Sequence, residues 1–152
     1  MATKTVNIAG YARNNEQFVV KTDSFDIRFN RNAKHPELHG PTPIEYVLAG
    51  LAGCIHSIGK VVADELGIHL ESLQVNISGD MDVDKYKGQD TTERPGYQFI
   101  EVAVKPISDA SDAQLQNWLN ILQKRCPVSD NLLNPTAVSI HLIRKLETAE
   151  AY

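Results

Sequence analysis

Two cysteines in very different surroundings are the residues of this chain best suited to chemistry. Cys126 is followed at once by Pro127, whereas Cys54 lies inside an apolar run that covers residues 43–59. An ionised thiol is a nucleophile and a redox centre, while a free thiol on its own is more often a small buried apolar side chain. Because the two contexts differ so strongly, the pair favours chemistry over packing.

Cys126 has a physical case for reactivity that does not depend on Cys54. Pro127 suits the first position of a short helix, so Cys126 would occupy the N-cap. There the helix dipole and free N–H groups stabilise a thiolate, and Lys124 and Arg125 add positive charge. Cys54 lacks this help, because an apolar helix disfavours a thiolate and the helical face of Cys54 carries no cation. A thiolate at Cys54 therefore requires a positive group from elsewhere in the chain.

None of the histidines is expected to bind a metal or to pair with a cysteine. His56 lies about 200° round the helix from Cys54. His35 precedes a proline, which disfavours helix, so it does not share a helical face with His39. His141 alternates with apolar neighbours in a strand pattern and is expected to point away from the core. Two cysteines are also too few for a disulfide framework or a four-cysteine zinc site, so no metal is expected.

Composition and charge exclude several classes of protein. With 152 residues the chain suits one domain, 1–152, which can bury roughly 70% of its unfolded surface. The net charge of −4 and the lack of a basic run argue against nucleic-acid binding. The longest uncharged stretch of the central segment, residues 46–59, is shorter than the roughly 20 residues of a membrane span. No secretory signal is evident at the start, so the protein is expected in the cytoplasm, where thiols stay reduced.

The pattern of the N-terminal third predicts a β-meander. Apolar and polar residues alternate in 25–29, and more weakly in 6–8 and 18–20, which indicates three short strands. Residues 35–41 contain two prolines and a glycine, and are expected to form a loop without regular structure.

A long central helix is predicted from Pro43 to Leu66, followed by a glycine that ends it. Thr42 at the N-cap and Glu45 three residues later form a capping box. Because nearly every face of the first half is apolar or small, this helix is expected to be buried at the centre of the fold. Gly50 and Gly53 weaken a helix, and they indicate that another backbone or a substrate approaches there.

The rest of the chain predicts a hairpin, further helices and a last strand. The expected elements are, in order, strands around 73–77 and 100–104 joined by a long connection, a helix capped by Ser111 that ends near Arg125, a short helix from Pro127, and a strand at 138–142. The larger aromatic side chains are expected in the core, namely Tyr46, Phe99 and Trp118. This order of elements indicates an α+β fold in one domain.

Two sequence motifs resemble those of the OsmC/Ohr family. The first is Gly40-Pro41-Thr42-Pro43 followed by Glu45 and by the run Val47-Leu48-Ala49-Gly50-Leu51-Ala52-Gly53-Cys54, and the second is Cys126-Pro127-Val128-Ser129. The resemblance covers most of the chain. It implies the OsmC-like α+β fold, with the order βββ-α-ββ-α-β and Cys54 on a long central helix. It also implies a homodimer of intertwined subunits with two active sites at the dimer interface.

The same resemblance implies a thiol peroxidase that reduces organic hydroperoxides and, more slowly, hydrogen peroxide. It assigns Cys54 as the thiol that attacks the peroxide, and Cys126 as the thiol that resolves the resulting sulfenic acid to a disulfide. No bound cofactor is implied. An external dithiol reduces the disulfide, and in the Ohr branch of the family this is a lipoyl group on a carrier protein.

The family places an arginine from the N-terminal sheet beside the reactive thiol, held by a glutamate near the start of the central helix. Arg13 is the best match for this arginine, and Arg28 is its rival. In the peroxidases the carboxylate often follows the helix-opening proline directly, a place that Ile44 occupies here. Glu45, one residue later, either positions the arginine or only closes the capping box.

Two other interpretations of the same residues stay open. The displaced glutamate fits a non-catalytic member of the fold that binds a small apolar ligand at the dimer cleft. The cysteines also fit a redox sensor that is oxidised without turnover.

Overall fold

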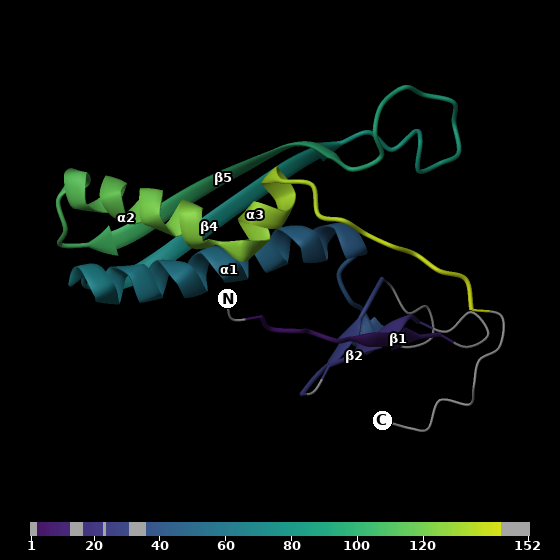
Figure 1. Ribbon diagram of the computed structural model, residues 1–152, viewed down its shortest axis with the longest axis horizontal. Helices are drawn as coiled ribbons and strands as arrows, with labels where there is room; N and C mark the ends of the chain where they lie inside the picture. The colour runs from purple at the N-terminus through teal and green to yellow at the C-terminus, as the bar shows by residue number, and fades with distance from the viewer. Residues whose placement is uncertain (1–2, 13–16, 23, 31–35, 144–152) are drawn as a thin grey trace.

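A 24-residue helix, α1 (Pro43–Leu66), runs through the centre of the molecule (Figure 1). In this computed structural model, which describes residues 3–12, 17–22, 24–30 and 36–143, the helix has the predicted ends. The Thr42 hydroxyl accepts a hydrogen bond from the Glu45 backbone N–H at 3.3 Å, and the Glu45 carboxylate accepts one from the Thr42 N–H at 2.7 Å. Gly67 follows with a φ of 66°, the left-handed conformation that commonly ends helices.

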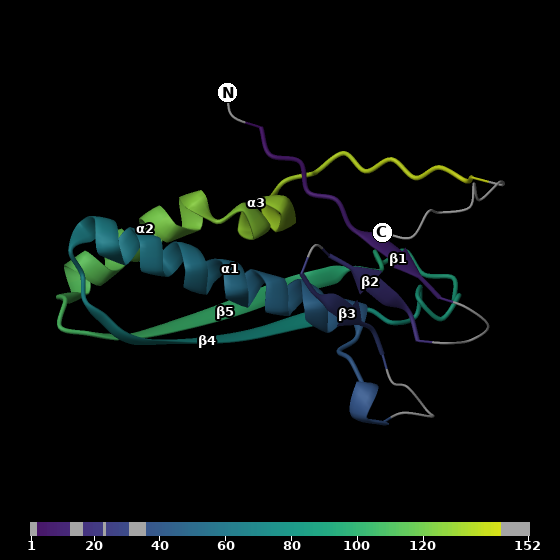
Figure 2. The ribbon, with the colours of Figure 1, turned by 90° about the horizontal axis from the view of Figure 1, so that it is seen from below.

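An antiparallel hairpin, β4 (Leu70–Met81) and β5 (Tyr97–Ser108), lies along α1 (Figure 2). One face of the hairpin, with the cross-strand pairs Val75–Val104 and Ile77–Val102, packs against the core. Residues 82–96 connect the two strands. The predicted hairpin is confirmed, with longer strands and a shorter connection.

Two further helices, α2 (Asp112–Arg125) and α3 (Pro127–Leu133), pack against α1 on the same side of the hairpin (Figure 2). Ser111 caps α2 through a second capping box, as the sequence predicts. Trp118 of α2 is 1% exposed, and its indole N–H donates to the Gly59 carbonyl of α1 at 2.7 Å. This hydrogen bond fixes the position of α2 along the axis of α1. Both predicted helices are confirmed.

The core of these five elements, hereafter the body (residues 43–133), is apolar. Among the described residues, no polar or charged side chain is buried. The buried cluster consists of Leu51, Ile55, Val62, Ala63, Ile68, Trp118, Leu122 and Cys126. A thiol therefore lies among aliphatic and aromatic side chains, which is a poor environment for a charge.

The N-terminal meander is confirmed as a separate antiparallel sheet of β1 (Ala9–Tyr11), β2 (Val19–Lys21) and β3 (Asp26–Arg28). Two contacts of Tyr46 join it to α1. The ring of Tyr46 lies 4.8 Å from the Phe29 ring, and its hydroxyl donates to the Arg28 carbonyl at 3.1 Å. Of the described residues before α1, Val19 and Val20 are the buried ones. The sheet is thus attached to the body at one end of α1.

The central helix is less buried than the sequence predicts. Its buried residues are Leu51, Ile55, Gly59, Val62 and Ala63, while Val47, Gly50 and Gly53 are exposed. A Cβ atom at Gly50 or Gly53 would have no neighbour within 4 Å, so nothing in the described chain explains these glycines. By length and apolar composition α1 would also suit a membrane span, a property that core helices share. One chain supplies too few elements to surround a helix that is apolar on nearly every face.

The predicted last strand is wrong for the single chain. Residues 135–143 run extended from the end of α3, but no described strand of this chain pairs with them (Figure 1). Val138, Ile140 and Leu142 are 79%, 91% and 85% exposed. The alternation of apolar residues is present, but among the described residues no strand lies beside it.

Three smaller predictions also need correction. The first strand forms at 9–11 instead of 6–8, because Gly10 opposite Val20 leaves room for the Phe18 ring. The loop before α1 contains one 3-10 turn, η1 (Pro36–Leu38). Phe99 is 62% exposed, since the alternation of β5 turns it away from α1. Trp118 is buried as expected, and Tyr46 is half-buried.

Candidate active site

The two cysteines, 72 residues apart in the sequence, meet in the structure. Cys54 lies on α1, and Cys126 lies at the joint where it is both the C-cap of α2 and the N-cap of α3. Their sulfur atoms are 2.9 Å apart, with the Cys126 thiol as hydrogen-bond donor. Both are free thiols, Cys126 buried and Cys54 half-buried. The two sulfurs are therefore close enough for one thiol to react with an oxidised form of the other.

Pro127 explains the position of Cys126. A residue that precedes proline is disfavoured in the helical conformation, and Cys126 has φ −79° and ψ 106°. α2 ends there, and α3 starts with Pro127 as its first residue. The break in direction places the Cys126 side chain in the core, against Cys54 of α1.

Burial raises the pKa of the Cys126 thiol above its ordinary value, and the hydrogen bond to Cys54 raises it further. The Ser129 backbone N–H, which donates to the Cys126 sulfur at 3.4 Å, acts in the opposite direction. The predicted N-cap position is confirmed, but the thiolate expected there is disfavoured, because burial outweighs the helix terminus. Cys126 therefore keeps its proton at neutral pH.

The cations next to Cys126 in the sequence do not bind the sulfurs. Arg125 forms a two-pronged ion pair with Glu65 of α1, in which one N–O distance is 3.1 Å. This pair lowers the pKa of the Glu65 carboxyl and raises the pKa of Arg125. Lys124 is exposed, and within the described ranges no cationic side chain donates a hydrogen bond to either sulfur. Arg125 instead ties the end of α2 to α1.

Of the two candidate arginines, Arg13 lies outside the described residues, so its role stays a prediction. Arg28, its rival, lies in β3 with its guanidinium 3.8 Å from the Asp26 carboxylate. Glu45 closes the capping box, and hydrogen bonds from Thr42 lower the pKa of its carboxyl. The predicted capping box is confirmed, and the use of Glu45 in positioning an arginine stays a prediction.

Two tyrosines hold the first turn of α1, a role that sequence reasoning missed. The Tyr97 hydroxyl donates to the Ile44 carbonyl at 3.0 Å, and the Tyr46 hydroxyl donates to the Arg28 carbonyl of β3. The Tyr97 ring covers Gly79, where a Cβ atom would come within 2.6 Å of it. Burial raises the pKa of Tyr97, and the charge of Glu45 raises it further. The one clue in the sequence is a glycine in a strand, which often marks a close approach.

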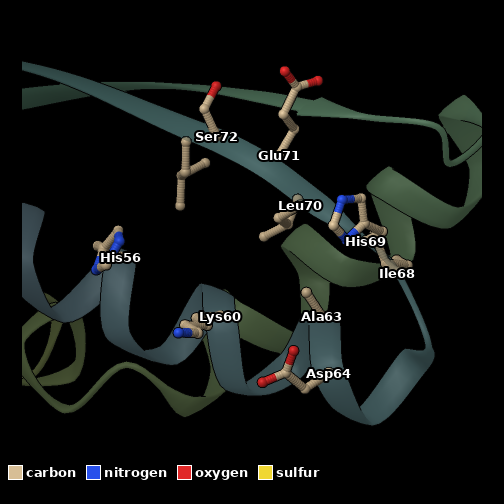
Figure 3. A pocket seen from close by; sticks show the side chains of 10 residues that line it. His56, Lys60, Ala63, Asp64, Ile68, His69, Leu70, Glu71 and Ser72 are labelled. Carbon is tan, nitrogen blue, oxygen red and sulfur yellow. The ribbon is translucent and has the colours of Figure 1, made fainter.

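A cavity of about 370 Å³ lies between α1 and the start of β4 (Figure 3). No cysteine lines it. Its polar walls are His56, Lys60 and Asp64 from α1, and His69, Glu71 and Ser72 around the start of β4. The described residues contain no group of three His, Cys, Asp or Glu side chains placed to hold a metal ion, and His35 lies outside them. His56 thus faces this cavity, which agrees with its exclusion as a partner of Cys54.

Comparison with known proteins gives a consistent set of matches. The family model described as OsmC-like protein matches residues 34–141 of this chain. A hydroperoxide reductase of Mycoplasma pneumoniae is 22% identical over 139 residues, which cover 91% of this chain and 94% of the relative.

Solved structures share the same fold. An OsmC-like protein from Mycoplasma pneumoniae matches with a TM-score of 0.75 at 22% identity, over 88% of this chain and 91% of that chain. The organic hydroperoxide resistance protein OhrB of Bacillus subtilis matches with a TM-score of 0.56 at 21% identity, over 88% of this chain and 94% of that chain. The expected α+β OsmC-like fold is confirmed.

Proposed function

Because this chain belongs to the OsmC-like protein family, we propose that it is a cysteine-based peroxidase that reduces organic hydroperoxides. The observation that carries the proposal is the distance of 2.9 Å between the sulfurs of Cys54 and Cys126, which lets one thiol react with the oxidised form of the other. A relative that matches over most of both chains is named a hydroperoxide reductase. Hydrogen peroxide is reduced more slowly, because the buried side chains around the thiols are apolar and suit an alkyl group.

The proposed reaction has two steps. The Cys54 thiolate attacks the O–O bond and takes one oxygen as a sulfenic acid, and the alkoxide leaves and gains a proton to become the alcohol. The Cys126 thiol then attacks the Cys54 sulfur, which gives the disulfide and water. The difference in exposure supports this assignment, because the half-buried Cys54 can meet a substrate and the buried Cys126 cannot.

The first step needs a cation near Cys54, and we assign this role to Arg13. Among the described cations, Arg28 pairs with Asp26 and Arg125 pairs with Glu65. A free cation is required because an apolar environment disfavours the thiolate. Glu45 orients Arg13 in this proposal, through the carboxylate oxygen that the capping box leaves free.

We further propose that the protein works as a homodimer of intertwined subunits. Val6 and Ile8 before β1, the Gly50 and Gly53 face of α1, and residues 138–142 are all exposed in the single chain. Apolar surface of this extent marks an interaction site. A second copy in twofold symmetry covers α1 and supplies a strand partner for residues 138–142.

The disulfide is returned to thiols by an external dithiol, which we propose to be a lipoyl group on a carrier protein, and the protein needs no bound cofactor. Since Cys126 is buried, the reductant attacks the sulfur of Cys54. Such a cycle belongs in a reducing compartment, which supports a cytoplasmic protein that responds to oxidative stress.

The test is the consumption of cumene hydroperoxide by the purified protein with dihydrolipoamide as reductant. With reductant we expect turnover in the wild type and none in Cys54→Ser. Without reductant, Cys126→Ser should consume one equivalent and stop as a sulfenic acid that dimedone traps. Asn117→Ala, on the exposed face of α2 and away from the proposed dimer surface, is the control and should keep turnover. No turnover by wild-type protein with both thiols shown to be reduced would overturn the proposal.

A second function, binding of a small apolar ligand without catalysis, is favoured by one observation. Both the backbone and the hydroxyl of Thr42 donate to one carboxylate oxygen of Glu45, which is a capping role that requires no arginine. A binding protein would show no turnover in the same assay. Its affinity for an apolar ligand would be unchanged in Cys54→Ser, which separates it from the peroxidase.

A further inference from the structure

The hydrogen bond between the two thiols has a direction. The Cys126 sulfur accepts a hydrogen bond from the Ser129 N–H at 3.4 Å. The Cys126 S–H is directed at its other polar neighbour, the Cys54 sulfur at 2.9 Å. The donor is therefore the thiol that cannot meet substrate, and the acceptor is the thiol that can.

The surroundings of Cys126 strengthen this hydrogen bond. Cys126 is 1% exposed and belongs to the apolar cluster of the body, so water does not compete for its S–H group. A hydrogen bond in such a low-dielectric environment is stronger than one in water. Burial raises the pKa of Cys126, which favours the protonated form of this donor.

The charged groups on the elements packed around the pair are exposed or paired elsewhere. On the described helices these groups are Glu45, His56, Lys60, Asp64 and Glu65 of α1, Asp112, Lys124 and Arg125 of α2, and Asp130 of α3, and all of them are exposed. Arg125 binds Glu65, and the Asp130 carboxylate accepts from the Asn134 side chain at 2.8 Å. The residues of β4 and β5 that pack on the core are apolar. Within the described ranges, Cys126 is thus the side chain that donates to Cys54.

We propose that Cys126 acts already in the first step of the reaction, as the hydrogen-bond donor that holds Cys54 as a thiolate in the reduced protein. The catalytic role of this hydrogen bond rests on the proposed function. The hydrogen bond itself, from the Cys126 thiol to the Cys54 sulfur, can be tested without any peroxide. Cys126 is thus a catalytic residue before oxidation as well as after it.

The same proton balances the second step. Once Cys54 carries the oxygen as a sulfenic acid, the Cys126 sulfur attacks the Cys54 sulfur, and the S–O bond breaks. The leaving hydroxyl takes the proton of Cys126 and departs as water. Disulfide formation in this arrangement requires no external base, which a buried thiol would be poorly placed to reach.

Two variants separate the donor from the nucleophile. Cys126→Ser keeps a hydroxyl donor and Cys126→Ala does not, while neither can form the disulfide. The measurement is the rate of Cys54 alkylation by iodoacetamide as a function of pH, followed by mass spectrometry of the Cys54 peptide. In Cys126→Ala we expect the midpoint to rise by about one pH unit, because a hydrogen bond to a charged group contributes an amount of this order. In Cys126→Ser the midpoint should stay near that of the wild type.

Equal midpoints in the two variants would overturn the inference. If Cys126→Ala does not fold, the infrared S–H stretch of Cys126 decides instead. It should move to higher frequency in Cys54→Ala, which removes the acceptor, and an unchanged stretch would contradict the proposal. Failure of the proposed function looks different: the two midpoints would differ as expected, while no form of the protein consumed cumene hydroperoxide.

Discussion

The body and the two end segments follow the same sequence rules but differ in what covers their apolar residues. In the body, the apolar faces of α1, α2 and the hairpin meet, and Trp118 is 1% exposed. In the end segments, residues 3–30 where described and 135–143, Phe25 is 75% exposed and Ile140 is 91% exposed. The comparison teaches that an apolar pattern predicts which face is covered, and that the cover need not come from the same chain.

The largest effect is expected inside the body. Trp118→Ala removes the largest buried side chain and its hydrogen bond to Gly59, and should lower the free energy of unfolding by about 3–5 kcal/mol. Urea unfolding followed by circular dichroism measures this. Phe25→Ala is the matched change in an end segment, and should cost less than about 1 kcal/mol at a concentration where the protein is monomeric. Similar losses in the two variants would break the comparison.

The next effect concerns the end segment at residues 135–143. Ile140→Asp places a charge on the apolar side of the alternation, and should weaken the proposed dimer by about 2 kcal/mol, roughly 30-fold. Sedimentation velocity over a dilution series measures the dissociation constant. Ser139→Asp adds the same charge on the other side of the segment and should have a much smaller effect. Equal shifts would show that residues 138–142 do not pair as a strand in the dimer.

Two glycines of α1 sharpen the comparison within one helix. At Gly59 a Cβ atom would lie 3.0 Å from the Trp118 ring, so Gly59→Ala should cost about 1–2 kcal/mol of unfolding free energy. At Gly53 a Cβ atom meets nothing within 4 Å in the chain, so Gly53→Ala should stabilise the monomer by up to about 1 kcal/mol. We expect the same Gly53 variant to dimerise more weakly. A Gly53 variant with unchanged dimerisation would place the interface elsewhere.

The smallest effect is expected where the body meets the N-terminal sheet. The folded protein lowers the pKa of Glu45 below its ordinary value of 4.5, because Thr42 donates to the carboxylate. A lowered pKa means that this carboxylate stabilises the fold above pH 4.5, and that the contribution is lost as pH falls below it. Glu45→Gln keeps an acceptor for the cap and removes the titration, so its stability should fall less steeply on acidification. Thermal melts between pH 6 and pH 3, compared with wild type, test this.

The ends of the helices of the body could be predicted because their signals are local. Thr42 and Glu45 set the start of α1, a glycine sets its end, and the break between α2 and α3 follows from Pro127. The exposure of α1 and the unpaired segment 138–142 could not be predicted. They depend on which surfaces a single chain can cover, and no local pattern contains that information.

The candidate site shows the same division. The resemblance to the OsmC/Ohr family implied that Cys54 and Cys126 act together, and the structure brings their sulfurs within 2.9 Å. The sequence also suggested a thiolate at Cys126, whereas packing with Trp118 and Leu122 buries that thiol and raises its pKa. The contact of Tyr97 with the start of α1 was missed, since it joins residues 53 positions apart.

The place of Cys126 as the shared cap of α2 and α3 has a consequence for unfolding. The proposed disulfide would tie this joint to α1 across 72 residues of chain. A cross-link of that span removes entropy from the unfolded chain worth about 4 kcal/mol, which for a chain of this size raises the melting temperature by roughly 10 °C. Oxidised and reduced molecules in one sample would melt as two populations, and their ratio would report what fraction of the protein awaits its reductant.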